Sequence, residues 1–254
     1  PKPGNVHPAA RFEDLSYAHF VTSAAIVGPI LAKSQQRGVG QTVLDAASAT
    51  RASVATNTNL GTLLLIAPMS AVPADVPIAD GIGLVLAGLD ENDTQLVYEA
   101  IRVANPGGLG TVANGDVSDR APRIPLVEAM RPAADRDMVA QQYVNGFTEV
   151  FATAALLAEF SYTQTLSNAI VRGQLQLLAK HPDSLIARKC GRTIAREAAD
   201  RAAALIATDS TTYDKQLREF DDWLRADGHR RNPGTTADLI AAALFVLLRD
   251  GLVR

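Results

Sequence analysis

Two rigid turns rich in polar side chains lie at opposite ends of this 254-residue chain and hold residue types that bind anions. Proline fixes the backbone angle φ and glycine permits positive φ, so segments that combine them bend sharply and keep one shape. Rigid loops with polar side chains are common places for binding sites. An ammonium, amides, an imidazole and hydroxyls suit phosphate groups. The polar candidates in the two turns are Lys2, Asn5, His7, Asn232, Thr235, Thr236 and Asp238.

Three aspartates follow patterns that suit either helix capping or metal and proton chemistry. Asp14 lies in a Glu-Asp pair at an expected helix start, where a carboxylate stabilises the helix dipole. Asp183 precedes a helical turn and can be its N-cap, and Thr235 with Asp238 matches a capping box. Even with this capping box, the first turn of the last helix can still bind an anion. The alternative is that the three carboxylates bind Mg²⁺ or serve as a general base.

Two further polar segments lie between the ends of the chain. Asn57, Thr58 and Asn59 come just before Gly61 and between two expected helices. They can cap the second helix, or they can hold a ribose hydroxyl or a phosphate near its N-terminus. Arg188 follows Asp183 by five residues, and it is either a solvated charge or a clamp on a phosphate.

Spacing argues against several other kinds of site. The four histidines show no zinc-ligand spacing. Cys190 has no triad signature beside it, and we expect it to be a small buried residue. The glycine-rich segment 105–110 lacks the Gly-Lys-Ser/Thr ending of a phosphate-binding loop and follows a helix, which favours an ordinary turn.

Composition describes a soluble protein that does not work on nucleic acids or membranes. The chain is 47% hydrophobic and 20% charged, and its net charge of -3 gives no broad basic surface. The longest apolar run, 239–248, is too short to span a bilayer, and the start lacks the pattern of a signal peptide. A single cysteine fits a reducing compartment, so we expect a cytoplasmic protein.

The elements that must position these residues are expected to be helices. Alanine and leucine are abundant while aromatic residues make up only 5%, which favours close helix packing over sheets. The pattern predicts a single all-α domain over residues 1–254, arranged as a compact multi-helix orthogonal bundle. Segment 115–132 is rich in Asp, Arg and Pro and is expected to be an ordered loop or lid. Expected helices are 13–36, 40–54, 59–67 (stopped by Pro68), 78–89, 93–104, 135–160 (with a possible break at 145–146), 162–180, 191–207 and 236–249.

The order of these motifs resembles the triphosphoribosyl-dephospho-CoA synthase family. The chain has Pro-Lys-Pro-Gly-Asn, then Glu-Asp, Asn-Thr-Asn-x-Gly, Asp-Ser-x-Ile-x-Arg-Lys-x-Gly and Asn-Pro-Gly-Thr-Thr-Ala-Asp-Leu. The resemblance runs from residue 1 to about residue 248, and the first and last motifs are its most specific elements. It implies an all-helical enzyme that removes adenine from ATP and transfers the triphosphoribosyl group to the 2′-hydroxyl of dephospho-CoA.

The resemblance also implies roles for the candidate residues. Asp14, Asp183 and Asp238 become the Mg²⁺ ligands or the general base, and which of them is the base is left open. The remaining motif residues would bind the phosphates or the ribose of ATP. These are Lys2, Asn5, His7, Asn57, Thr58, Asn59, Arg188, Asn232, Thr235 and Thr236.

Two motifs depart from the family pattern and keep other functions open. Relatives carry Gly-x-His-x-Asp-Met where this chain has Phe12 in place of the histidine, and Asn-Thr-His-Lys-Gly where it has Asn59 and Leu60. The pattern is similar to a divergent archaeal and bacterial branch. One alternative is therefore a nucleotide-dependent transferase that acts on another acceptor in methanopterin- or methanofuran-type C1-carrier biosynthesis. A second is a non-catalytic helical adaptor. A homodimer is compatible with either.

Overall fold

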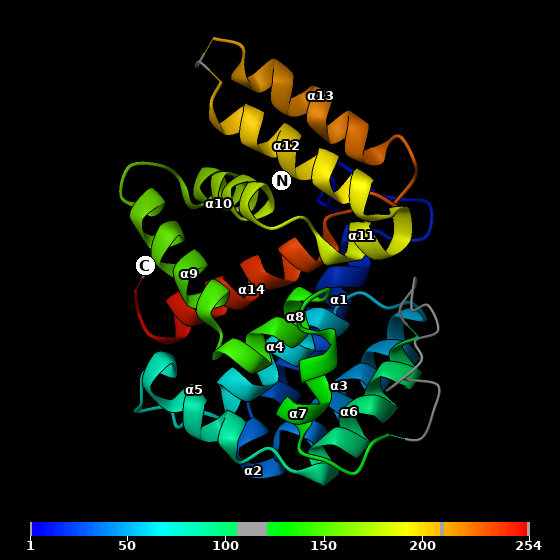
Figure 1. Cartoon of the computed structure of the whole chain (residues 1–254), viewed down its shortest axis with the longest axis vertical. Coiled ribbons are helices and arrows are strands. Elements are labelled where there is room, and N and C mark those ends of the chain that lie inside the picture. Colours follow the sequence, from blue (N-terminus) through cyan, green and yellow to red (C-terminus); the bar gives the residue numbers. More distant parts are fainter. Residues whose placement is uncertain (1, 106–120, 209–210, 253–254) are drawn as a thin grey trace.

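The computed structural model describes residues 2–105, 121–208 and 211–252, and within them all regular structure is helical. The helices cross one another at steep angles, and α14 runs through the middle of the molecule (Figure 1). The all-α orthogonal bundle predicted from composition is therefore confirmed. The elements are α1 Tyr17–Leu31, α2 Ser34–Arg37, α3 Val39–Val54, α4 Leu60–Ala71, α5 Ile78–Ala87, α6 Glu91–Ala104, α7 Leu126–Met130, η1 Arg131–Ala133, α8 Met138–Asn145, α9 Thr148–Ser161, α10 Leu166–Lys180, α11 Ser184–Cys190, α12 Arg192–Ile206, α13 Tyr213–Arg225 and α14 Gly234–Arg249.

The larger of two hydrophobic cores surrounds α14. Helix α14 packs against α4 and α9, while α3 packs against α1, α4 and α6. Leu63, Leu65, Leu239 and Ile240 are among the residues that this core removes from water. Fully burying one such side chain is worth about 1.5–3 kcal/mol, so this core fixes where the first turns of α4 and α14 lie.

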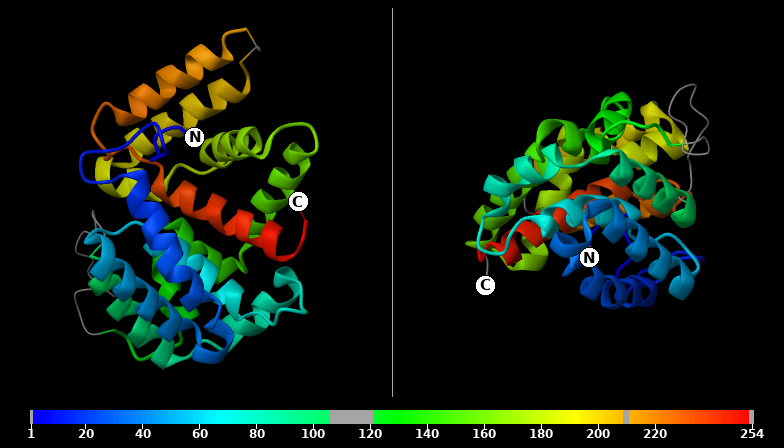
Figure 2. Two further views of the ribbon diagram at one scale, coloured as in Figure 1. Left: turned by 180° about the vertical axis from the view of Figure 1, so that it is seen from behind. Right: turned by 90° about the horizontal axis from the view of Figure 1, so that it is seen from below.

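The smaller core joins α10, α11, α12 and α13. Leu175, Leu178, Ile186 and Leu224 are buried in it, and α12 packs against both α10 and α13. Helices α12 and α13 form an antiparallel pair that projects from one end of the molecule in both side-on views (Figures 1 and 2). This second core therefore holds α11, α12 and α13 against α10, beside the larger core.

Pro68 lies inside α4, so the prediction that this helix stops at residue 67 is wrong. Proline has no N–H, and the carbonyl of Leu64, four residues earlier, loses its partner within the helix. The hydroxyl of Tyr143 on α8 donates to that carbonyl at 2.6 Å. Burial raises the pKa of Tyr143, so the hydroxyl remains a donor. A side chain from another helix therefore satisfies the group that the proline exposes.

The chain before α1 is not helical, contrary to the prediction of one helix over 13–36. Helix α1 begins at Tyr17 after Ser16, whose N–H donates to Nδ1 of His19 at 3.5 Å, and α2 forms separately beyond it. Asp14 lies in the loop before this helix, so it is not a partner of the helix dipole in the first turn. The carboxylate is free to face another segment.

The segment predicted as a loop or lid is partly helical where it is described. Residues 106–120 lie outside the described residues, and most of the predicted turn at 105–110 lies there too. Residues 121–125 contain no helix, as predicted, but α7 and the start of η1 follow them, so the prediction of a loop is wrong from Leu126 on. The break predicted within 135–160 is confirmed at Gly146, which has a φ of 71° between α8 and α9.

The two ends of the chain meet, and a glycine permits the contact. Gly4 has a φ of 71°, and an added Cβ would lie 2.8 Å from both Leu224 and Pro233. The N–H of Gly4 donates to Asp221 at 2.6 Å. Because a larger residue would clash and be strained there, the first motif can approach the last only with glycine at this position.

Candidate functional site

Asp183 joins the first turns of α11 and α14. It is 1% exposed, and its Oδ1 accepts from the N–H groups of Leu185 and Ile186, as an N-cap does. Its Oδ2 accepts from both N–H and Oγ1 of Thr236, each at 2.7 Å. The N-cap interpretation is therefore confirmed. A carboxylate offers about four acceptor positions, so this arrangement uses all of them.

Burial and these hydrogen bonds act on Asp183 in opposite directions. Desolvation is the larger effect and raises the pKa of Asp183, while the bonds from Thr236, Ile186 and Leu185 lower it. The carboxylate acts here as a joint between two helices. To bind a metal it would have to give up bonds that satisfy backbone N–H groups.

The predicted capping box between Thr235 and Asp238 is not formed. Helix α14 begins at Gly234 with Pro233 at the N-cap position, so Thr235 lies inside the first turn. The hydroxyl of Thr235 instead accepts from Ser184 at 3.0 Å. The N–H of Thr236 is already bound to Asp183, which takes one donor away from the predicted anion site at this turn.

Asp238 lies against the start of α4, and its surroundings change its acidity. Oγ1 of Thr62 donates to its Oδ1 at 2.6 Å. A Cβ at Gly61 would collide with its Oδ2, so the carboxylate fits only because this residue is glycine. Burial is the main cause that raises the pKa of Asp238 to about 7, with nearby Asp183 adding to it, while Thr62 and Lys2 lower it.

Lys2 is a cation near Asp183 and Asp238, and these three residues are called the inner cluster here. Burial lowers the pKa of Lys2, and the charge of Asp238 raises it, so the two groups lie close enough to affect each other. Lys2 comes from the first motif and Asp238 from the last. The structure therefore brings Lys2, Asp183 and Asp238 together, as the family resemblance implied.

Asp14 belongs to a more exposed outer cluster. Its Oδ1 lies 3.0 Å from Nδ1 of His229, and the Asp14 side chain is 58% exposed. The His229 ring meets Phe12 edge-on at 5.9 Å. Burial lowers the pKa of Lys189, as does Arg188, while Asp14 and Asp183 raise it. Lys189 therefore links Asp14 electrostatically to the inner cluster.

The Asn-Thr-Asn segment is held by its own hydrogen bonds. Oδ1 of Asn57 accepts from the N–H groups of Asn59 and Leu60. The N-cap residue of α4 is Asn59, whose side chain makes no capping bond, so Asn57 supports the start of this helix from two residues before its N-cap. Thr58 and Ser23 share a hydroxyl hydrogen bond of 2.7 Å, and Nδ2 of Asn59 donates to Thr50.

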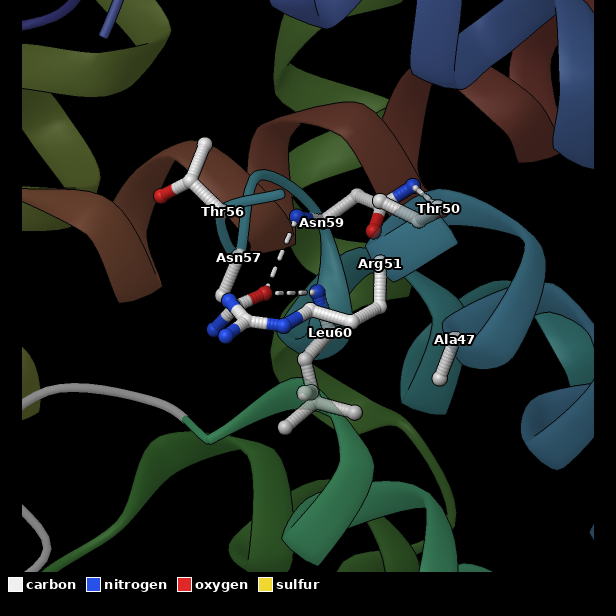
Figure 3. Close-up of a pocket in the computed structure, with 8 residues that line it drawn as sticks. Ala47, Thr50, Arg51, Thr56, Asn57, Asn59 and Leu60 are labelled. Atoms are coloured by element: carbon white, nitrogen blue, oxygen red, sulfur yellow. Dashed lines mark hydrogen bonds between the residues drawn. The ribbon is translucent and has the colours of Figure 1, made fainter. Parts of the chain in front are cut away.

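A shallow pocket lies beside this segment, and Figure 3 shows the Arg51 guanidinium next to Asn57 there. The side chain of Arg51 also donates to the carbonyl of Ala55 at 2.6 Å. The residues that line the pocket are Ala47, Thr50, Arg51, Thr56, Asn57, Asn59, Leu60 and Ala104. It borders the N-terminus of α4, the helix that Asp238 contacts from the other chain end.

Asn5 and Asn232 bind each other. Nδ2 of Asn5 donates to Oδ1 of Asn232 at 2.6 Å, and Oδ1 of Asn5 accepts from Gln174. Arg225 donates to the backbone carbonyl of Asn5. In this arrangement the two asparagines hold the first motif against the last and against α10.

His7 and Arg188 lie away from the carboxylate cluster, next to other groups. Burial lowers the pKa of His7, and the neighbouring charge of Arg225 lowers it further. Nη1 of Arg188 binds Oδ2 of Asp137 at 3.0 Å, at the N-cap of α8. The structure therefore does not bring these two residues to the carboxylate cluster.

A small hollow of about 10 Å³ lies beneath Asp183, enough for one water molecule. Nε2 of His181 is buried beside it and has no partner within the described residues. Burial lowers the pKa of His181, so the imidazole is neutral near pH 7. The other walls of the hollow are Met138, Leu177, Thr235, Thr236 and Leu239.

Asp14, Asp183 and Asp238 are not grouped as the ligands of one metal ion. Among the described residues, no three His, Cys, Asp or Glu side chains are grouped so as to hold an ion. Mg²⁺ that arrives with a nucleotide needs only one or two carboxylates, because phosphates and water fill the other positions. Asp14 and Asp238 keep acceptor positions that could serve in this way, so the residues fit Mg²⁺ bound to a substrate.

Sequence reasoning missed five residues of this region. Gly61 and Thr62 directly follow the Asn-Thr-Asn segment, and Ser184 and Lys189 flank predicted residues, so the motifs themselves pointed to them. His229 had no local signal, because its partner Asp14 lies at the other end of the chain. Cys190 is only partly buried, not fully buried as predicted.

Fold and site together define an all-helical protein in which the two chain ends close around a cluster of carboxylates and lysines. The model of the ATP:dephospho-CoA triphosphoribosyl transferase family matches residues 1–253. The chain belongs to this family and is a transferase.

A solved structure supports the same placement. The chain is similar to an Archaeoglobus fulgidus protein described, provisionally, as a triphosphoribosyl-dephospho-CoA synthase. The two are 27% identical with a TM-score of 0.71, over 92% of this chain and 100% of the other. No curated protein matches the chain significantly. Within the described residues, no helix is long and apolar enough to cross a membrane.

Proposed function

We propose that the protein transfers the triphosphoribosyl group of MgATP to the 2′-hydroxyl of dephospho-CoA and releases adenine. The observation that supports this proposal is the proximity of Asp238 and Lys2, two motif residues from opposite chain ends that influence each other electrostatically. Membership of the transferase family supplies the reaction class. Cytoplasmic location and small-molecule substrates complete the proposal.

Asp238 is the general base in this scheme. A base works best when its pKa lies near the working pH, and the pKa of Asp238 is raised to about 7. The C1′–N9 bond of ATP breaks, and its electron pair leaves with adenine, which takes up a proton from water. The acceptor oxygen forms the new bond to C1′, and its proton passes to Asp238. A carboxylate beside the sugar also stabilises the positive charge that develops at C1′.

Asp183 holds the site in place rather than reacting. Its four hydrogen bonds keep the starts of α11 and α14 together, and its charge helps to raise the pKa of Asp238. Loss of these bonds would shift Asp238, and even a small misplacement of a reacting group lowers the rate strongly.

The triphosphate lies on the side of the cations. Lys2 neutralises part of its charge, and Mg²⁺ enters as part of the ATP complex, with Asp14 as the exposed carboxylate that can take one coordination position. The ion supplies charge neutralisation for the triphosphate. The asparagine and threonine side chains of the motifs orient the ribose and phosphates through hydrogen bonds.

The test is to incubate the protein with ATP, Mg²⁺ and dephospho-CoA and to look for adenine by chromatography and for the enlarged CoA product by mass spectrometry. Adenine that appears only when all components are present is the expected result. Formation of ADP or AMP without adenine would show phosphoryl or nucleotidyl transfer instead and overturn the proposal. An Asp238→Asn sample identifies any contaminating nucleosidase.

A second candidate is transfer to another acceptor, and the Asn-Thr-Asn segment favours it. Leu60 stands where relatives carry a lysine and is buried in the core, so this chain lacks a cation there. An acceptor from C1-carrier biosynthesis would use the same triphosphate site. A thermal shift with ATP, without turnover of dephospho-CoA, supports this candidate over the first. Family membership argues against the non-catalytic adaptor.

A further inference from the structure

The two neighbouring cations at the end of α11 face different parts of the molecule. Consecutive residues on a helix lie about 100° apart, so Arg188 and Lys189 cannot serve the same partner. Nη1 of Arg188 is 3.0 Å from Oδ2 of Asp137, which also caps α8. Arg188 is therefore committed to a contact between α11 and α8.

The turn of α11 that carries Lys189 lies beside the Asp14–His229 pair. Lys189 is half-buried, and Asp14 and Asp183 both act electrostatically on its ammonium. Within the described ranges, no carboxylate comes within ion-pair distance of it. Its backbone carbonyl accepts from Arg230 at 3.0 Å, which ties this turn of α11 to the segment that carries His229.

A half-buried ammonium without a close counter-ion is unfavourable unless something else compensates it. Loss of water from the charge is costly, and the nearby cation Arg188 adds to the cost. A solvated surface lysine would extend away from the protein instead. An anionic ligand that lies between Lys189 and the carboxylate cluster would supply the missing partner, and lysine is well suited to phosphate as a compact point charge.

We propose that Lys189, and not Arg188, binds the polyphosphate chain of the donor nucleotide. This proposal rests on the proposed function and names a binding residue for it. Lys2 lies beside Asp238, whereas Asp14 and Asp183 act electrostatically on Lys189. Two cations at separate points of one acidic cluster suit an extended chain of phosphates better than a single phosphate.

The experiment measures binding of inorganic tripolyphosphate with Mg²⁺ to the full chain by calorimetry. Lys189→Gln should weaken binding at least about 10-fold, and Lys189→Arg should restore part of it, because charge is the requirement. Arg188→Gln removes an equal charge from the adjacent position and should change affinity less than about 2-fold, since its partner is Asp137. Arg192→Gln, at the start of the next helix, controls for net charge. Circular dichroism confirms that each variant is folded, and Lys189→Met replaces Lys189→Gln if the latter is not.

Equal affinities for the wild type and Lys189→Gln would overturn the proposal, as would a larger loss in Arg188→Gln. A wild-type protein that releases adenine from ATP but does not bind tripolyphosphate would also overturn it while leaving the proposed reaction intact. Conversely, tight tripolyphosphate binding that depends on Lys189, without adenine release, supports this binding role and contradicts the proposed reaction.

Discussion

The inner and outer halves of the site use the same kinds of side chain in different surroundings. The inner half contains Lys2 from the N-terminal segment, Asp183 at the starts of α11 and α14, and Asp238 on α14 against the start of α4. The outer half pairs Asp14 with His229 near the surface. The inner aspartates have raised pKa values and serve helix ends, whereas Asp14 is largely exposed and touches only a loop.

The difference shows that burial, not residue type, separates the roles of the three aspartates. A buried carboxylate that keeps its hydrogen bonds stabilises the fold and changes its acidity. An exposed carboxylate contributes little to stability and is available to a ligand. The following predictions test this division.

The largest expected effect is on catalysis by Asp238→Asn. The amide keeps the shape and can still accept from Thr62, but it cannot take a proton, so kcat should fall about 10²–10⁴-fold. The measurement is the initial rate of adenine release. Asp250→Asn, at the other end of α14, serves as the control because Asp250 contacts Ile78 and Arg249 instead. Retention of more than half the activity would remove Asp238 as the base.

Asp183→Ala should have the largest effect on stability. It removes the cap of α11 and leaves the buried Thr236 groups unpaired, so the free energy of unfolding should fall by about 2–4 kcal/mol. Denaturant unfolding measures the change. Asp137→Ala is the matched comparison, because Asp137 also caps a helix, but its contact with a second helix is a part-exposed ion pair with Arg188. This substitution should cost about 0.5–2 kcal/mol. Equal losses would show that the link to α14 is not important.

The pH dependence of stability should reveal the raised pKa of Asp238. The folded state binds this proton more tightly than the unfolded chain, whose carboxyl has a pKa of 3.8. The contribution to stability is therefore complete below about pH 4 and is lost as the pH rises through about 7. Unfolding at several pH values should show that the wild type loses stability relative to Asp238→Asn across this range. A constant difference between them would contradict the assignment.

Asp14→Asn should have the smallest effect on stability, under about 1 kcal/mol, because its ion pair with His229 is exposed. It should instead raise the KM for MgATP, since the exposed carboxylate is proposed to meet the Mg²⁺ complex. Unfolding curves and rates at several Mg²⁺ concentrations give both quantities. A large loss of stability with an unchanged KM would place Asp14 with the inner aspartates.

Most helices could be predicted from the residues, but some of their ends could not. Alanine and leucine content predicted the all-α fold, and glycine predicted the break at residue 146. The stop at Pro68 was wrong because Tyr143, distant in the sequence, satisfies the carbonyl that the proline leaves unpaired. Local rules treat a proline as a helix end, while the tertiary structure can supply a replacement hydrogen bond.

Site prediction succeeded where a motif had a local reason and failed where partners came from elsewhere. The N-cap role of Asp183 follows from its position directly before α11. The capping box of Thr235 and Asp238 was wrong, because both side chains have partners on other elements, Ser184 and Thr62. The resemblance placed Arg188 at a phosphate, yet the rotation of one residue around α11 turns it towards α8.

By itself, the order of residues determined an all-helical chain and two rigid polar motifs, since helix propensity and turn geometry act over short distances. The tertiary structure decided that these motifs meet, that Asp238 is desolvated beside Lys2, and that Asp14 stays near water. Acidity and pairing depend on which distant groups surround a side chain, and only the packing of the two cores sets those surroundings.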